Sequence, residues 1–178
     1  MSKYLLLALI VVTPAFAQGQ AAAPRTAAGS GAANVKFDVK TNKKQHTVAQ
    51  PEPGKALVYV IVQEISDPHA MQIGDVTTRV GLDGNWVGAN YGRSYISFAV
   101  EPGEHHICTD WQSRLKAAEK LSGAAELTAE AGKTYYYRAE LTMPWEQHNA
   151  DLRLKAVDDA EGLLLISKSA MSTWKAKK

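Results

Sequence analysis

Short stretches of alternating hydrophobic and polar residues recur along most of the chain. Residues 56–62 differ, because they are apolar on both faces, rich in β-branched residues and too few for a typical helix. This pattern predicts a central strand of a sheet that is buried on both faces. The alternating stretches predict half-buried strands, and they lie at residues 76–82, 95–100, 104–111, 125–130, 135–141 and 152–156.

Turn signals separate these stretches. Asp83-Gly84 predicts a tight two-residue hairpin turn, and Pro102-Gly103 and residues 131–133 predict further turns. Many short strands with such turns between them are typical of a sandwich or barrel, and they do not fit alternating strands and long helices. We therefore expect an all-β fold, an antiparallel immunoglobulin-like β-sandwich that spans residues 55–174.

The hydrophobic period changes only near the C-terminus. Asp158, with Glu161 three residues later, resembles a capping box. A short C-terminal helix is therefore expected, although Gly162 weakens it. Residues 113–121 also have high helix propensity, and residues 175–178 are expected to form a basic tail.

Residues 1–17 have the pattern of a signal peptide. Lys3 precedes an apolar run at residues 5–12, and Ala15 and Ala17 place small residues where signal peptidase needs them. The alternative is a membrane anchor, but a spanning helix needs about 20 apolar residues and this run is shorter. We expect export, cleavage near Ala17, a periplasmic or extracellular location and no stable membrane span.

Residues 18–54 are expected to form a flexible linker rich in alanine, glycine and lysine. Residues 18–34 offer almost nothing to bury in a core. Val35, Phe37 and Val39 alternate with polar residues, so an edge strand is the alternative there.

The composition is that of an ordinary globular protein. Of 178 residues, 46% are hydrophobic and 21% are charged, which excludes a wholly disordered chain and a multi-span membrane protein. The formal net charge is only +2, so the basic excess typical of nucleic-acid binding is missing. We expect no nucleic-acid partner.

The sequence predicts no catalytic, metal or cofactor site. His105, His106 and Cys108 contain zinc-ligand types, but neighbours on a strand point to opposite faces, so at most His106 and Cys108 share a face. The lone Cys108 lacks the setting of a known nucleophile motif, and a packed thiol is the simpler interpretation. A disulfide to another molecule stays open if its sulfur is exposed. We expect a protein that is not an enzyme.

Aromatic residues supply the candidate ligand surface, which comprises Trp86, Tyr91, Tyr95 and Trp111. Flat apolar faces with polar rims bind sugars and other small ligands. The alternative is that these rings fill the core or the ends of the sandwich.

Three groups of residues occur together in an order that resembles a known family. Residues 80–88 read Val-Gly-Leu-Asp-Gly-Asn-Trp-Val-Gly, residues 100–105 read Val-Glu-Pro-Gly-Glu-His, and residues 131–136 read Ala-Gly-Lys-Thr-Tyr-Tyr. The set resembles Domain of Unknown Function 2846, a bacterial family of exported proteins and lipoproteins, and it is similar to the small PEGA-type β-sandwich. The resemblance covers about residues 55–168 and implies an exported all-β domain of unassigned activity. Many relatives are acylated, and this chain lacks the cysteine next to the apolar run.

Together these features predict an exported, non-enzymatic module that has an interaction or structural role in the cell envelope. Its expected partner is an envelope protein or a glycan. The alternative is a periplasmic protein that binds a glycan or another small ligand through the region from Trp86 to Tyr95.

We predict that the exported protein begins at Gln18, because cleavage after Ala17 follows from the two small residues. N-terminal sequencing and intact mass of the exported product measure this directly. An Ala17→Arg variant is the control, since its large side chain blocks cleavage at that position. A product that starts at Met1, or one that carries an acyl group, contradicts the prediction.

Overall fold

The computed structural model describes residues 30–44, 46, 48–63, 76–112, 121–142 and 151–177. Within these residues it contains ten strands and one helix. In chain order they are β1 (Phe37–Asn42), β2 (Ala56–Val62), β3 (Thr77–Leu82), β4 (Asn85–Tyr91), β5 (Ser94–Val100), β6 (Gly103–Gln112), β7 (Ser122–Ala129), β8 (Thr134–Thr142), β9 (Asp151–Val157), α1 (Asp159–Ser167) and β10 (Ala170–Ala176). The predicted signal peptide, residues 18–29 of the predicted linker and residues 113–120 of the helix-prone stretch 113–121 lie outside the described residues.

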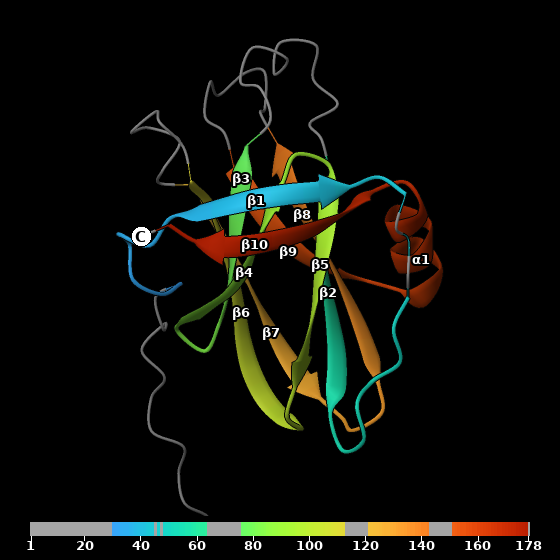
Figure 1. Cartoon of the computed structure of the whole chain (residues 1–178). Coiled ribbons are helices and arrows are strands. Elements are labelled where there is room, and N and C mark those ends of the chain that lie inside the picture. Colours follow the sequence, from blue (N-terminus) through green and yellow to red (C-terminus); the bar gives the residue numbers. More distant parts are fainter. Residues whose placement is uncertain are drawn as a thin grey trace, which may run out of the picture.

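The strands form two sheets that pack face to face (Figure 1). One sheet has six strands in the order β1-β10-β5-β2-β8-β9, and the other has four in the order β4-β3-β6-β7. The all-β prediction is therefore confirmed for the part of the chain that the structure describes.

Strand β2 lies in the middle of the six-stranded sheet, between β5 and β8. Its first six residues are buried, as the apolar run predicts. It pairs antiparallel with β5 but parallel with β8, and β10 pairs parallel with β5. The prediction of a purely antiparallel sheet is therefore wrong. The chain makes an excursion through the four-stranded sheet between β5 and β8, and a long crossover of this kind permits parallel pairing.

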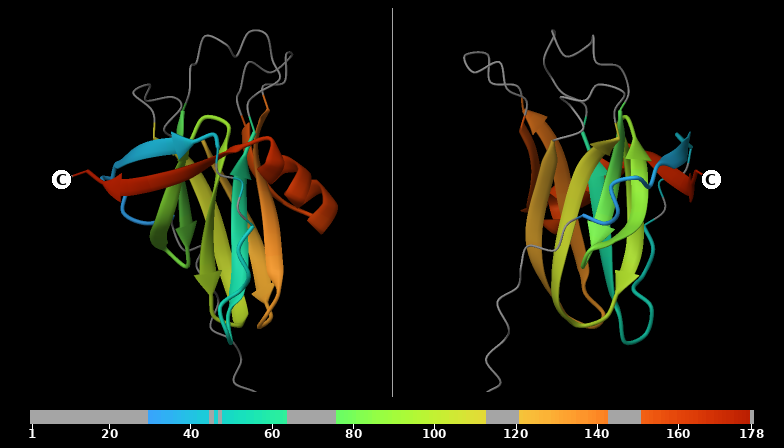
Figure 2. Two further views of the ribbon diagram at one scale, coloured as in Figure 1. Left: turned by 45° about the vertical axis from the view of Figure 1, so that its right-hand side comes forward. Right: turned by 90° about the vertical axis from the view of Figure 1, so that its left-hand side faces the viewer.

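The central strands of the six-stranded sheet are buried on both faces. Its inner face and the four-stranded sheet enclose the main core, which includes Val58, Val80, Ile96, Ile107, Leu127 and Tyr137. Its outer face is partly covered by α1, and there a second cluster contains Leu57, Tyr59, Ile61, Tyr95, Tyr136 and Ile166. Figure 2 shows α1 against this outer face and the β1–β10 pair across one side of the molecule.

The Asp83-Gly84 turn joins β3 to β4, as predicted. Asp83 has φ 49° and Gly84 has φ 81°. Positive φ at both central residues is what the tight hairpin turn requires, and asparagine, aspartate and glycine tolerate it best.

The predicted C-terminal helix is confirmed as α1. The carboxylate of Asp158 accepts a hydrogen bond from the backbone N–H of Glu161 (2.8 Å), which caps the first turn. Gly162 is buried, and a Cβ there would collide with the ring of Tyr136. Gly162 has low helix propensity, but because it has no Cβ it allows α1 to approach β8 closely. No helix among the described residues is long and apolar enough to cross a membrane.

Strand β1 corrects the linker prediction for residues 18–54. It pairs with β10 along its whole length, from Phe37 opposite Ala176 to Asn42 opposite Met171. This pairing also places the start of the predicted basic tail inside β10. The side chain of Gln112 accepts a hydrogen bond from Phe37 N (2.6 Å) and donates one to Phe37 O (3.0 Å). Its amide therefore makes the two hydrogen bonds that the backbone of a neighbouring strand would make. Composition alone does not reveal these distant partners.

Residues 30–35, here called the strap, lie over the outer face of the four-stranded sheet. Arg79 on β3 holds them, and its side chain donates to Ala33 O (3.1 Å) and Val35 O (2.6 Å). The same guanidinium donates to both carboxylate oxygens of Asp110 (2.6 and 2.7 Å) and lies 4.6 Å from the ring centroid of Trp86. Arg79 is only 6% exposed.

We expect Arg79→Met to lower the free energy of unfolding by about 3–5 kcal/mol, because Asp110 then stays buried without its partner. The double variant with Asp110→Leu removes both charges, so it should cost less than the single change. Urea denaturation of both variants measures the difference. A single variant as stable as the unmodified protein would show that Arg79 does not hold the strap.

Candidate functional site

The four aromatic candidates do not form one surface. Tyr95 is 1% exposed and Trp111 is 4% exposed, so the predicted ligand surface is wrong for these two residues. Tyr95 packs beside Tyr59 in the cluster near α1, with ring centroids 6.0 Å apart. Trp111 lies opposite Thr78 on the inner face of the four-stranded sheet. Both rings fill space that the packing of the layers would otherwise leave open.

Trp86 has a structural role on the other face of that sheet. Its indole N–H donates to Ala32 O of the strap (2.9 Å), and Arg79 lies over its ring. Of the four candidates, only Tyr91 is widely exposed, at 40%.

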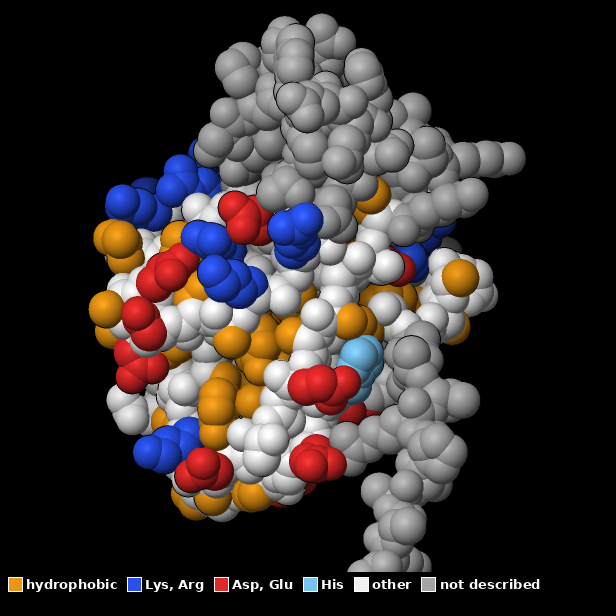
Figure 3. Space-filling view, turned by 180° about the vertical axis from the view of Figure 1, so that it is seen from behind, with side chains coloured by type: hydrophobic (Ala, Val, Ile, Leu, Met, Phe, Trp, Pro, Cys, Tyr) orange, Lys and Arg blue, Asp and Glu red, His pale blue; other side chains and the backbone are white. Residues whose placement is uncertain are grey.

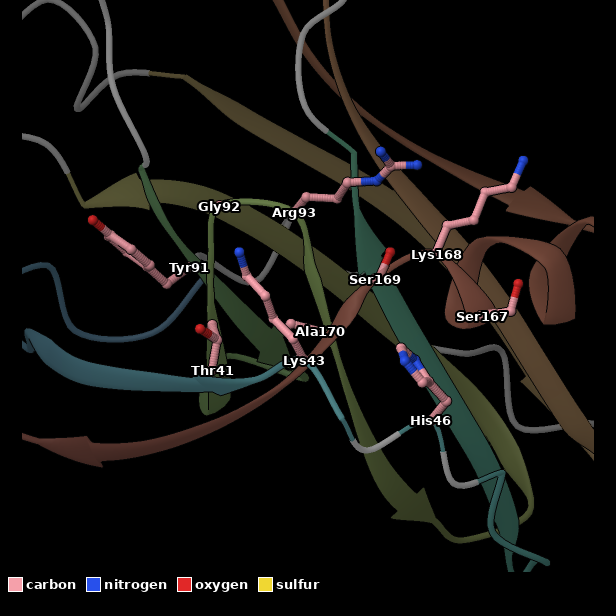
Figure 4. A pocket seen from close by; sticks show the side chains of 10 residues that line it. All are labelled: Thr41, Lys43, His46, Tyr91, Gly92, Arg93, Ser167, Lys168, Ser169 and Ala170. Atoms are coloured by element: carbon pink, nitrogen blue, oxygen red, sulfur yellow. The ribbon is translucent and has the colours of Figure 1, made fainter.

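Tyr91 lines a pocket of about 370 Å³, here called the basic pocket. Three parts of the chain form it: the end of β1 with the turn after it, the β4–β5 turn, and the junction of α1 with β10 (Figure 4). Its lining residues are Thr41, Lys43, His46, Tyr91, Gly92, Arg93, Ser167, Lys168, Ser169 and Ala170.

Backbone and side-chain hydrogen bonds order the β4–β5 turn and join it to β10. Ala170 N donates to Arg93 O (3.3 Å), and Tyr91 N donates to the hydroxyl of Ser94 (3.1 Å). The hydroxyl of Ser172 on β10 in turn donates to that of Ser94 (2.8 Å). These bonds fix the backbone from which the side chains of Tyr91 and Arg93 project.

The end of α1 forms the opposite wall. Ser169 N donates to Ile166 O (3.1 Å) in the tight turn that ends the helix. His46 approaches from the segment after β1, and its Nδ1 donates to the same carbonyl (3.3 Å). The hydroxyl of Ser167 donates to Leu164 O (2.7 Å).

Among the described residues that line the basic pocket, the charged ones are all cations. They are Lys43, Arg93 and Lys168, and no described aspartate or glutamate lines the pocket. No described carboxylate forms an ion pair with any of the three. The face seen from behind differs, because acidic and basic side chains lie there near one another around hydrophobic ones (Figure 3). The basic pocket therefore attracts anions locally, although the net charge of the chain is small.

The histidine pair of β6 belongs to a different cluster, at the Asp83-Gly84 turn. Asp83 Oδ2 lies 2.7 Å from His105 Nδ1, and Asp83 Oδ1 accepts from His106 N (2.8 Å). His105 Nε2 lies 2.7 Å from Glu101 O. Both ring nitrogens of His105 thus lie beside oxygen atoms that can accept a hydrogen bond.

Asp83 has a pKa below its ordinary value of 3.8. Burial of the carboxylate opposes ionisation, but the hydrogen bonds from the His106 N–H and the His105 ring favour the charged form more strongly. The cluster therefore secures the hairpin turn to β6.

Cys108 is buried, in agreement with the packed-thiol interpretation. Burial raises the pKa of its thiol above 9.0, so the sulfur stays protonated at neutral pH.

His106 Nδ1 lies 3.0 Å from Glu126 Oε1, across the ladder between β6 and β7. Within the described residues, no three ligand-type side chains lie together where they would hold a metal ion.

Sequence reasoning missed most of the basic pocket. Lys43 and His46 lie in the stretch that the sequence predicts to be a flexible linker, and Tyr91 is a predicted site residue. Arg93 and Lys168 carry no local signal, because only the pairing of β10 with β5 brings them to one place.

Comparisons with known proteins assign no family to the chain. No family model matches it, and no curated protein matches it. It is similar to the solved structure titled "NMR structure of the protein from Eubacterium rectale", with a TM-score of 0.37 and 16% identity over 61% of this chain and 94% of the other. A likeness at this level supports no argument about fold or function. The resemblance to the exported-domain family stays a prediction.

We expect stability to depend on Asp83 at acid pH. Because its folded-state pKa is lowered, its contribution is present above pH 3.8 and is lost as the pH falls through the lower folded value. Asp83→Asn keeps a residue that tolerates positive φ but removes the titration. Between about pH 5 and about pH 3, where histidine is protonated, the unmodified protein should lose more stability than this variant. Denaturation midpoints at several pH values measure this, and parallel curves would contradict it.

Proposed function

We propose that the protein is an exported, non-enzymatic β-sandwich module that acts by binding material of the cell envelope. The observation that carries this proposal is the basic pocket, where three cations from distant parts of the chain line one concavity and none of the described lining residues is a carboxylate. Such a site holds an anionic partner in place and needs no chemical step.

Several features support binding over catalysis. The Ser167 hydroxyl donates to Leu164 O and His46 donates to Ile166 O, so these side chains serve the end of α1 rather than each other. None of the described lining residues is a carboxylate that could act as a general base. Cys108 is buried and lies outside the lining.

The finer fold assignment and the location belong to the same proposal. A two-layer arrangement around one apolar core supports a relative of the immunoglobulin-like sandwich, with a mixed sheet in one layer. The pattern of residues 1–17 supports export. The partner is then an envelope protein or a glycan. Tyr91 in the lining favours the second candidate function, a glycan- or small-ligand-binding protein.

Retention of the processed protein on purified envelope fragments tests the proposal. We expect retention that weakens as salt is raised, because exposed charges are screened. The variant Arg93→Glu with Lys168→Glu should lose most of it. The control variant is Lys133→Glu with Lys155→Glu, which changes the net charge by the same amount at two residues outside the lining. It should be retained like the unmodified protein. No retention of the unmodified protein, or equal retention of both variants, would contradict the proposal.

A further inference from the structure

We propose that the basic pocket binds a single acidic sugar unit, one that carries a carboxylate or a phosphate group. This inference rests on the proposed binding function and specifies its ligand. The argument combines the charge of the lining, its hydroxyl groups, its exposed ring and its volume.

The cations define the charged part of the ligand. Lys43, Arg93 and Lys168 line one concavity and no described lining residue is a carboxylate, so the pocket attracts an oxyanion. The planar guanidinium of Arg93 fits two oxygens of a carboxylate or phosphate at once, whereas lysine acts as a point charge. Because Arg93 O accepts from Ala170 N, the backbone that carries this side chain is already held.

The hydroxyl groups define the polar part. Ser169 is 2% exposed and lies immediately before β10, among the surrounding side chains (Figure 4). Its oxygen accepts from Gln63 Nε2 (3.4 Å), which leaves its own O–H free to donate. Thr41 adds a second hydroxyl to the lining. Groups that both donate and accept suit the hydroxyls of a sugar better than they suit a bare inorganic anion.

The ring and the volume define the size. Tyr91 is 40% exposed and gives the pocket an aromatic face, on which the apolar side of a sugar ring can stack. A volume of about 370 Å³ lies at the small end of the range for ligand pockets. It suits one sugar unit rather than a length of polysaccharide, so a terminal or branching residue of an envelope glycan fits this proposal.

Calorimetric titration of the processed protein tests the ligand class. The probes are glucuronate, glucose 6-phosphate, neutral glucose and inorganic phosphate. We expect at least one acidic sugar to bind roughly tenfold more tightly than glucose, because a charged hydrogen-bonded pair is worth about that factor. Whether glucuronate or glucose 6-phosphate binds better distinguishes a carboxylate ligand from a phosphate ligand.

Pocket variants assign the binding to this site. Arg93→Ala should weaken the acidic sugar roughly tenfold, and Arg93→Lys should recover only part of the loss. Tyr91→Ala should weaken the sugar while leaving inorganic phosphate unchanged. Lys133→Ala, outside the lining, should leave all affinities unchanged. Unfolding midpoints of each variant confirm that it folds.

Three results would overturn the inference: no binding of either acidic sugar, equal binding of glucose, or inorganic phosphate that binds as tightly as both acidic sugars. Retention on envelope fragments separates this failure from failure of the proposed function. Retention without acidic-sugar binding preserves the binding function and rejects this ligand class, whereas loss of both rejects the two together.

Discussion

A buried guanidinium is the interaction on which the rest of the structure depends. Arg79 lies on the outer face of the four-stranded sheet, bound to Asp110 on one side and to two strap carbonyls on the other. Burial raises the pKa of Asp110 above 3.8, and the attraction of Arg79 opposes that rise without cancelling it. The ion pair is therefore costly to bury and adds little net stability. The pair instead fixes the position of the strap, because few other arrangements of residues 30–35 satisfy the hydrogen bonds of Arg79.

The position of the strap determines where the two ends of the described chain meet. The strap leads directly into β1, and β1 forms an antiparallel pair with β10. Gln112, two residues after Asp110 on β6, fixes Phe37 at the start of β1. β10 then reaches β5 through only two paired residues, from Ala170 opposite Ser94 to Met171 opposite Tyr95. This short junction is where the β4–β5 turn, the end of α1 and the residues after β1 enclose the basic pocket.

The same dependence explains why the pocket holds three cations that pair with no carboxylate in the part of the chain that the structure describes. Its cations come from three turns or element ends, where side chains project into solvent and packing does not select an apolar residue. By contrast, the charged groups at the Asp83 turn are matched with hydrogen-bond partners and stabilise the hairpin. The cations of the proposed binding pocket thus differ from the charges at the turn, which are matched and have a structural role.

The sequence by itself determined the features that depend on neighbours along the chain. The apolar run of β2 predicted a strand buried on both faces, Asp83-Gly84 predicted the hairpin, and Asp158 predicted the start of α1, since each signal acts within a few residues. Only the tertiary structure decided the parallel pairing of β2 with β8, the pairing of β1 with β10, the burial of Tyr95 and Trp111, and the meeting of Arg93 with Lys168. Alternation along a strand shows that one face is buried but does not identify what buries it. Which element covers that face depends on contacts between residues far apart in the sequence. In this protein those contacts include the strap and the short β10–β5 junction.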